Sequence, residues 1–398
     1  MKKFIGLNII VVALLISTFF LIFISCKQDP SNLRTYQLPE IIDDGIEVGS
    51  IDEVNIDQEL IEQAINDLDR GKYREVHSLL IYKDGKLVVE EYFKGHHYNY
   101  YEPRHHGKMV TFKSSTVHAL HSVTKSITST CIGIAVDNGF IKNVDQSIFD
   151  YLPEYQHLNA DGKAKISIEH LLTMTSGLEW DEWSANLSSS SNDIVGIWFS
   201  DKSPIEYVLE RPLVYEPGTR FTYSGGNMIV LGEILRNAAN IDIAEFSKKY
   251  LFEPLGIYSF EWWEQFENGV FETGGGLKGT PRDMLKIGIT FLNNGVYDGK
   301  QVISEQWVKK SSTPFGSNTG INIPGTDSKR VGYSYLWWIK EYSNSGREIN
   351  IYNAGGWGGQ RIIVLPEVNS VIVFTGGNYT STVRIYKILE NYILPAFG

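Results

Sequence analysis

The strand-like segments of this chain lie at its two ends, and helical patterns fill the part between them. Near the N-terminal end, "VHSLLIYKDGKLVVEEYF" has two apolar runs on either side of Asp84-Gly85, a dipeptide typical of tight hairpins. Near the other end, "REINIYNA", "GQRIIVLP" and "SVIVFTG" are three more short strands. This order predicts an α+β fold with one antiparallel sheet assembled from both termini, flanked by helices, with an inserted helical lobe.

Helical periodicity marks three segments outside that lobe. The first follows Ile56 and ends near Gly71, the second runs from Ser122 to Asn138, and the last begins near Ile385. Residues from about 140 to 270 carry helical periods broken by loops, and we expect them to form the lobe. The polar and aromatic stretch between the N-terminal strands and the second helix is interpreted as a surface excursion.

The N-terminus differs from the rest of the chain. Two lysines precede "FIGLNIIVVALLISTFFLIFIS", which is long enough for a signal sequence or a membrane span. This run ends at Ser25-Cys26, which resembles a bacterial lipobox, so residues 1–26 are expected to be a signal peptide with Cys26 lipidated. An uncleaved transmembrane anchor is the alternative. Either one predicts a membrane-anchored protein of the cell envelope, with its domain exported.

The remaining sequence is expected to divide into a tether and one domain. Residues 27–50 are polar and aperiodic and are interpreted as a tether, which leaves residues 51–398 for the domain. Hydrophobic residues make up 42% of the chain, enough for a sizeable core. The only other cysteine is Cys131, so no intramolecular disulfide is expected if Cys26 is acylated.

Charge argues against one class of partner. The net charge is -11, and no dense run of Lys and Arg follows the N-terminus, so nucleic-acid binding is not expected. The partners that we expect are a small-molecule ester or amide substrate and the membrane, through the N-terminal anchor. No obligate protein partner is inferred.

The stretch "HSVTKSI" contains Ser122 three residues before Lys125. In a helix this spacing puts both side chains on one face. A serine hydroxyl is a poor nucleophile until a base removes its proton, and a lysine can be that base only if its pKa is lowered. Free N–H groups at a helix start can also stabilise an oxyanion. An ordinary N-cap serine with a solvated lysine is the structural alternative, and this short pattern alone does not decide between them.

Further motifs follow in a fixed order. They are "IEHLLTMTSGLEWDE", "PGTRFTYSGGNMIVLGEIL", "GGGLKGTPRDMLKIG" and "NAGGWGGQRIIVLPE". Together with "HSVTKSI" they resemble the serine β-lactamase-like superfamily, which includes class C β-lactamases, DD-peptidases, related esterases and, above all, the 6-aminohexanoate-dimer hydrolase group. The resemblance runs from about residue 56 to the C-terminus and implies a β-lactamase/transpeptidase-like fold.

The resemblance implies roles for several positions. Ser122 matches the acylated nucleophile and Lys125 its partner, while Tyr223 in "YSGG" matches the tyrosine that transfers protons, as a phenolate or a relay. The third motif falls on Ala354-Gly355-Gly356, and a backbone N–H just after it completes the oxyanion hole with that of Ser122. We assign this N–H to Trp357, with Gly356 as the neighbouring candidate. If the family resemblance is set aside, Tyr223 is interpreted as a core aromatic residue and Gly355-Gly356 as a plain glycine-rich turn.

Two departures from the family pattern concern the substrate. Gly225 stands where the second motif normally has Asn, and the third motif lacks its cationic and hydroxyl-bearing residues. Those groups hold the polar parts of β-lactams, so their loss favours an esterase or amidase that acts on a small or linear substrate. Trp180 and Asp181 lie in a loop that borders the acyl pocket of the hydrolase relatives. We count them, with Gly225, Gly355 and Gly356, as candidate substrate-binding positions, the alternative being a solvated loop with packed tryptophans.

The histidines do not predict a metal site from the sequence. His96-His97 and His105-His106 are adjacent pairs, and neighbouring residues rarely point the same way. His121 is interpreted as a packing residue. No nucleotide motif is present, so neither a metal nor a cofactor is expected.

Three functional hypotheses follow. The first is a serine hydrolase, either esterase or amidase, that forms an acyl-enzyme on Ser122. The second is a DD-peptidase or penicillin-binding protein that acts on cell-wall peptides. The third is a non-catalytic binding protein on the same fold, which the intact Ser, Lys and Tyr disfavour.

Overall fold

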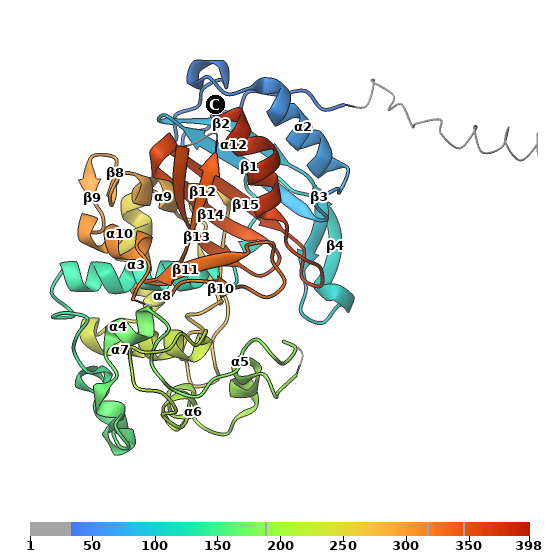
Figure 1. Ribbon diagram of the computed structural model, residues 1–398. Helices are drawn as coiled ribbons and strands as arrows, with labels where there is room; N and C mark the ends of the chain where they lie inside the picture. The colour runs from blue at the N-terminus through green and yellow to red at the C-terminus, as the bar shows by residue number, and fades with distance from the viewer. Residues whose placement is uncertain (1–32, 188, 317, 345–346) are drawn as a thin grey trace, which may run out of the picture. The chain divides into compact units, whose positions relative to one another are not determined.

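The central sheet joins strands from both ends of the chain. Its strands are β1 (Val76–Lys83), β2 (Lys86–Tyr92), β10 (Ile321–Asn322), β11 (Arg330–Ser334), β12 (Trp337–Asn344), β13 (Arg347–Gly356), β14 (Gln360–Leu365) and β15 (Ser370–Gly376). The computed structural model describes residues 33–187, 189–316, 318–344 and 347–398. The order is β10-β11-β12-β13-β14-β15-β1-β2, and every neighbouring pair is antiparallel (Figure 1). The sheet predicted from both termini is therefore confirmed.

The other elements surround this sheet or extend it. The shorter strands are β3 (Lys94–Tyr98), β4 (His106–Thr111), β5 (His118–Ala119), β6 (Glu261–Trp262), β7 (Leu277–Gly279), β8 (Val296–Tyr297) and β9 (Lys300–Gln301). The helices are α2 (Gln58–Asp69), α3 (Val123–Asp137), α4 (Ile168–Leu172), α5 (Asp193–Gly196), α6 (Pro204–Leu209), α7 (Gly225–Ala239), α8 (Ile243–Ser247), α9 (Pro281–Leu292), α10 (Glu305–Ser312), α11 (Ile385–Ile388) and α12 (Leu394–Ala396).

Strand β15 has apolar side chains on both faces because helices cover the sheet on both sides. Side chains alternate along a strand, so Val371 and Val373 face one way while Ile372 and Phe374 face the other. The two valines belong to the core that includes α3 and α9, and the other two belong to the core that includes α2 and α11. This explains why "SVIVFTG" is a continuous apolar run and not an alternating one.

Helix α3 confirms the helix predicted after His121, but it is buried on all sides. Every residue from Val123 to Ala135 is buried, including the polar ones. These polar side chains bond to backbone carbonyls: Thr128 Oγ1 donates to Thr273 at 2.7 Å, and Ser126 Oγ to Leu336 at 2.6 Å. Buried hydroxyls are tolerated when they are hydrogen-bonded. Helix α3 is thus held rigidly at its N-terminal end, where Ser122 lies.

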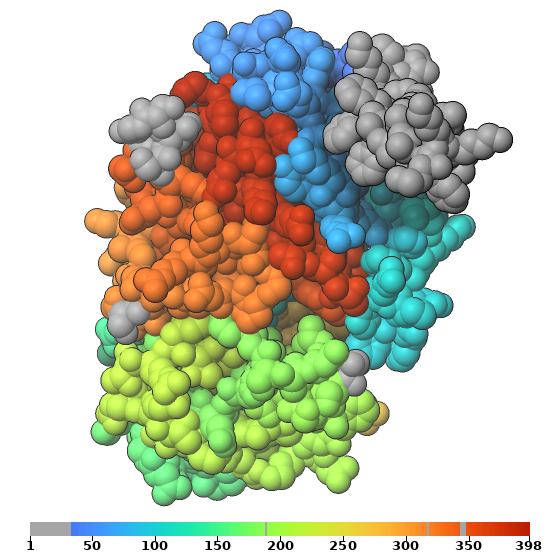
Figure 2. All heavy atoms as spheres, turned by 45° about the vertical axis from the view of Figure 1, so that its right-hand side comes forward, coloured from blue at the N-terminus to red at the C-terminus, as the bar shows by residue number. Residues whose placement is uncertain are grey.

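Helices α4 to α8 form the green and yellow part of the chain in Figure 1, and α7 packs directly against α3. Figure 2 shows the surface of this helical part meeting that of the orange and red C-terminal strands. The start of α3 and the N-terminal end of α7 both lie at this boundary, since Ser122 and Tyr223 line one cavity there. The sheet and the helical part therefore each contribute one wall of that cavity.

The tether predicted for residues 27–50 is wrong from Tyr36 onward. Ile46 is buried, and Val48 forms a β-bridge with Leu87. Asp44 makes an ion pair with Arg282 at 3.0 Å, which anchors this segment to α9. The polar composition misled the prediction because a few anchoring contacts are enough to order an otherwise irregular segment.

The predicted signal peptide and the lipidation site at Cys26 lie outside the described residues. Within the part of the chain that the structure describes, no helix is both long and apolar enough to cross a membrane.

Candidate active site

Ser122 and Lys125 lie together at the start of α3, as their spacing predicts. Lys125 Nζ donates a hydrogen bond to Ser122 Oγ at 3.1 Å. The Ser122 side chain makes no capping hydrogen bond to the helix, and Lys125 is 4% exposed. Both facts contradict the alternative of a capping serine with a solvated lysine, so the pair needs another explanation.

Lys125 is buried but does not have the lowered pKa that a resting base requires. Burial pushes its pKa down, yet negative charge at Tyr223, Glu182 and Glu272 outweighs burial and leaves it above its ordinary value. Lys125 Nζ also donates to the carbonyl of Gly274 at 2.9 Å. The direction of this pKa favours an ammonium ion at Lys125, because neighbouring acidic groups, which the sequence does not place, offset the effect of burial.

Tyr223 completes the group from the other wall. It lies two residues before α7, it lines the cavity beside Ser122, and its ring centroid lies 5.1 Å from Lys125 Nζ. Trp183 stacks on its ring at 5.2 Å and Trp338 at 5.9 Å between centroids. Burial raises the pKa of Tyr223, although Lys125 acts in the opposite direction. The two groups are therefore linked: negative charge at Tyr223 favours the ammonium form of Lys125, and positive charge at Lys125 favours ionisation of Tyr223.

The end of β13 lies against the segment that precedes Ser122. A Cβ atom on Gly356 would overlap the carbonyl oxygen of Leu120, so only glycine allows this approach. Ser122 and Trp357 consequently line the same cavity. Within the described ranges, neither of their N–H groups donates to a backbone carbonyl. An oxyanion hole requires two N–H groups that line one cavity and do not already donate to a backbone carbonyl.

His121, which precedes the serine, packs among aromatic rings. Its φ is +48°, an uncommon conformation for a residue with a side chain. Its ring lies 4.6 Å from that of Tyr98 and 5.4 Å from that of Trp357, edge to face. Burial lowers the pKa of His121 to about 3, with positive charge at His105 and Lys125 adding to the shift. A neutral His121 in a ring cluster agrees with the packing interpretation.

Two further carboxylates near Lys125 were missed by the sequence reasoning. Glu272 is 5% exposed and accepts from the N–H of Gly274 at 2.9 Å, next to the carbonyl that Lys125 contacts. Burial raises the pKa of Glu272, against the effect of Lys125. Burial and then the charge of Glu272 raise the pKa of Glu264 to about 8, although Lys278 opposes this.

The cavity at Ser122 has two lobes with different walls. Ser122, Glu182 and Trp357 line both. The larger lobe, about 620 Å³, adds residues from the sheet and the C-terminal loop, namely Trp338, Gly355, Gly356, Arg361, Asn378 and Tyr379. The smaller lobe, about 490 Å³, adds aromatic and acidic residues, namely Tyr98, Trp198, Trp263, Glu264 and Glu272. The candidate metal group among the described residues, Glu75, His96 and His106, lines neither lobe.

Comparison with known proteins identifies the family. The Beta-lactamase family model matches residues 61–383, most of the chain. The chain belongs to the Beta-lactamase family. A 6-aminohexanoate-dimer hydrolase from Paenarthrobacter ureafaciens is 28% identical over 264 residues, which cover 64% of this chain. The match spans 65% of that hydrolase, just under two thirds of its length.

Solved structures share the fold of this chain. An octameric penicillin-binding protein homologue from Pyrococcus abyssi has a TM-score of 0.60 and 19% identity, covering 85% of this chain and 77% of that one. A family VIII carboxylesterase has a TM-score of 0.61 and 14% identity, covering 90% of this chain and 99% of the esterase. At these identities the likeness concerns the fold alone.

The departure from the family pattern at Gly225 has a physical reason. The N–H of Gly225 donates to Glu182 Oε2 at 2.5 Å, and a Cβ atom there would lie 3.0 Å from the same oxygen. It would also lie 2.6 Å from Cδ1 of Ile194. Glu182 therefore occupies the space in front of α7, where the usual Asn side chain has no room. Sequence reasoning named Gly225 but missed Glu182.

Trp180 and Asp181, two other candidate substrate-binding residues, lie outside both cavity lobes. Trp180 is buried, and its Nε1 donates to Glu182 at 3.0 Å. The Asp181 carboxylate accepts from the N–H groups of Trp183 at 3.2 Å and Ser184 at 2.9 Å. Trp180 therefore supports Glu182, and Asp181 stabilises its own turn. Both residues line a neighbouring cavity of about 350 Å³ with Glu182 and Tyr223, so contact of these two side chains with the substrate stays a prediction.

Proposed function

We propose that the chain is a serine hydrolase that cleaves a linear amide or ester through an acyl-enzyme on Ser122. One observation carries the proposal: Lys125 Nζ donates to Ser122 Oγ at 3.1 Å, and Tyr223 lines the cavity beside Ser122 with its ring 5.1 Å from Lys125 Nζ. A serine that does not cap its helix, lines a cavity and accepts a hydrogen bond from a buried lysine is typical of an activated nucleophile. The N–H groups of Ser122 and Trp357 would hold the oxyanion.

The raised pKa values favour a proton relay over a resting base. Ser122 Oγ forms a bond to the carbonyl carbon, and the carbonyl electron pair moves to the oxygen. The serine proton passes to the Tyr223 oxygen as the phenol proton passes to the leaving atom. The oxyanion pair then re-forms the carbonyl double bond, and the leaving atom departs with the electron pair of the broken bond. The Lys125 ammonium stabilises negative charge that develops on Ser122 and Tyr223. Water then repeats the relay in reverse and releases the acid.

Charge in the cavity favours a substrate with an amine. Glu182, Glu264 and Glu272 line the smaller lobe, and Lys125 is the cation placed among them. The raised pKa values of Glu264 and Glu272 show that ionisation of these groups is disfavoured in the lobe, and an ammonium group entering it would stabilise their carboxylate forms. The related hydrolase is named for a dimer of an amino acid, 6-aminohexanoate. We therefore propose that the substrate is a short linear amide with a free amino end.

The test is a pair of matched substrates, 6-aminohexanoate dimer and its N-acetylated form, with the wild type and Ser122→Ala. We expect kcat/KM to be at least ~10-fold higher for the free amine, about 1.4 kcal/mol of transition-state stabilisation, and no turnover by the variant. Equal kcat/KM values for both substrates would contradict the proposed preference for an amine but would not contradict the mechanism through Ser122. Turnover by Ser122→Ala would overturn that mechanism. A long-lived adduct with penicillin G would favour the DD-peptidase hypothesis instead.

We also propose that the protein is anchored in the cell envelope through Cys26. The support is the N-terminal sequence alone, with its apolar run and terminal Ser25-Cys26. Metabolic labelling with a fatty acid would test it. Labelled wild type and unlabelled Cys26→Ala are expected, and equal labelling of both would contradict it.

A further inference from the structure

A second group of titratable side chains lies outside the active-site cavity. Glu75 lies just before β1, His96 is in β3 and His106 begins β4, so three segments contribute one residue each. One ligand-type atom from each residue lies within 4.8 Å of the other two. Neither adjacent histidine pair predicts a metal site by itself. The hairpin of β3 and β4 instead brings one histidine from each pair together.

The distances in this group match those between ligands of one metal ion. His96 Nδ1 lies 2.9 Å from Glu75 Oε1, and His106 Nε2 lies 3.4 Å from Glu75 Oε2. Tetrahedral zinc binds nitrogen and oxygen at about 2.0–2.1 Å, which separates neighbouring ligand atoms by roughly 3.3 Å. The imidazole rings lie parallel, with centroids 4.4 Å apart. Together with the 4.8 Å limit on the separation of the three ligand atoms, these contacts allow the donors to surround one ion after a small adjustment of the side chains.

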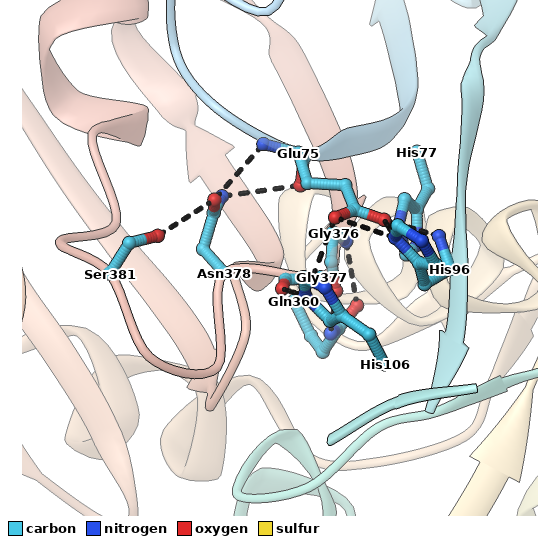
Figure 3. Close-up of polar contacts among 9 residues, drawn as sticks. All are labelled: Glu75, His77, His96, His106, Gln360, Gly376, Gly377, Asn378 and Ser381. Atoms are coloured by element: carbon cyan, nitrogen blue, oxygen red, sulfur yellow. Dashed lines mark hydrogen bonds and ion pairs between the residues drawn. The ribbon is translucent and has the colours of Figure 1, made fainter. Parts of the chain in front are cut away.

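The surroundings hold the carboxylate in position, as Figure 3 shows. The buried His77 Nε2 lies 3.4 Å from Glu75 Oε1, and the backbone N–H of His96 donates to the same oxygen. A Cβ atom on Gly95 would overlap the His77 ring and lie 2.8 Å from Glu75 Oε1. The glycine therefore leaves space beside the carboxylate. Supporting groups of this kind orient the ligands of metal sites in proteins.

We propose that Glu75, His96 and His106 bind one divalent transition-metal ion, with Zn²⁺ as the representative case. Two imidazole nitrogens and one carboxylate favour zinc and its neighbours over magnesium or calcium, which prefer oxygen ligands. The carbonyl of Gly377, 2.9 Å from His106 Nε2, lies at the edge of the same group and offers a further oxygen.

An ion at this position would reinforce one wall of the larger cavity lobe. The Glu75 N–H donates to Asn378 Oδ1 at 3.0 Å, and Asn378 Nδ2 donates back to the Glu75 carbonyl at 3.2 Å. Ser381 Oγ donates to the same Asn378 oxygen at 3.2 Å. Asn378 and Ser381 line the larger lobe. The ion would thus tie the β3–β4 hairpin to the loop after β15, a structural role separate from the proposed chemistry at Ser122.

Calorimetric titration of the untagged full chain with ZnCl₂ tests the proposal. We expect one Zn²⁺ per chain, and an affinity at least ~10-fold lower in His96→Gln and in His106→Gln. His97→Gln is the matched control, because it removes a neighbouring histidine of β3 whose ring packs edge to face against Phe112 at 5.3 Å. Its affinity should equal that of the wild type. If the three residues form only a hydrogen-bonded cluster, the wild type will not bind Zn²⁺ stoichiometrically, and this result would overturn the proposal. Unchanged affinity in both variants would overturn it as well.

A second measurement needs no variant. Anomalous diffraction at the zinc edge, from wild-type crystals grown with ZnCl₂, should place a peak between Glu75, His96 and His106. This outcome supports the site even if the two variants fail to fold. A peak elsewhere, with none at this group, would overturn it. Neither result depends on activity at Ser122.

Discussion

Gly356 lies so close to the carbonyl oxygen of Leu120 that a Cβ atom on the glycine would overlap that oxygen. This contact places the end of β13 beside the residue pair that precedes Ser122. It therefore sets the distance between the two N–H groups proposed to hold the oxyanion, those of Ser122 and Trp357.

Gly356→Ala should consequently damage catalysis. The new methyl group must push β13 away from Leu120 and move the N–H of Trp357. Loss of one oxyanion donor typically lowers kcat by about 10²–10³-fold. The measurement is kcat on a reactive ester, with thermal unfolding as a check of the fold.

Gly355→Ala is the matched comparison for Gly356→Ala. A Cβ atom on Gly355 would meet the far end of the Arg361 side chain at 3.1 Å, which can shift more easily than backbone. Its loss of activity should be smaller. Equal activity of Gly356→Ala and wild type would show that the close contact does not position the oxyanion site.

Lys125→Met should lower both activity and stability. Lys125 is buried with Glu182 and Glu272 nearby, and removing one partner from such a group typically costs about 3–5 kcal/mol. The cost should shrink as the pH falls, because protonation removes the uncompensated charge of the carboxylates. Urea unfolding of variant and wild type at pH 5 and pH 8 measures this. A difference in the free energy of unfolding that is the same at both pH values would count against the charge argument.

Glu264 gives a pH-dependent prediction of its own. Its pKa is raised to about 8, so the folded state binds this proton more tightly than the unfolded chain does. Stability from this group is therefore fully present below the ordinary pKa of 4.5, is lost as the pH rises through about 8, and then levels off because both states are ionised. Glu264→Gln cannot ionise, so its free energy of unfolding should fall less than that of the wild type between pH 6 and pH 9. Parallel curves for the two proteins would contradict the raised pKa.

The sequence predicted those parts of the site that depend on regular spacing. The hairpin at Asp84-Gly85 and the helix after His121 formed as expected, because turn chemistry and helical periodicity are local. Ser122 and Lys125 share a helix face for the same reason. Only the order of the motifs placed Tyr223 with Ser122 and Lys125, because residues about 100 positions apart share no local pattern in the sequence.

The residues that the sequence could not place lie in irregular segments. The loop after "TSGL" drew attention to Trp180 and Asp181, but Glu182 is the side chain that reaches the cavity. No period fixes the direction of a side chain in such a loop. Glu272 is likewise far from Lys125 in sequence, so its effect on the pKa of Lys125 could not be foreseen.

The most direct test of the central claim is intact-mass spectrometry of the chain after treatment with a fluorophosphonate. The account predicts one phosphonyl adduct on the wild type, located on Ser122 by peptide mapping, and no adduct on Ser122→Ala that has kept its fold. An unmodified wild type, or an adduct of equal yield on Ser122→Ala, would contradict the assignment of Ser122 as the nucleophile.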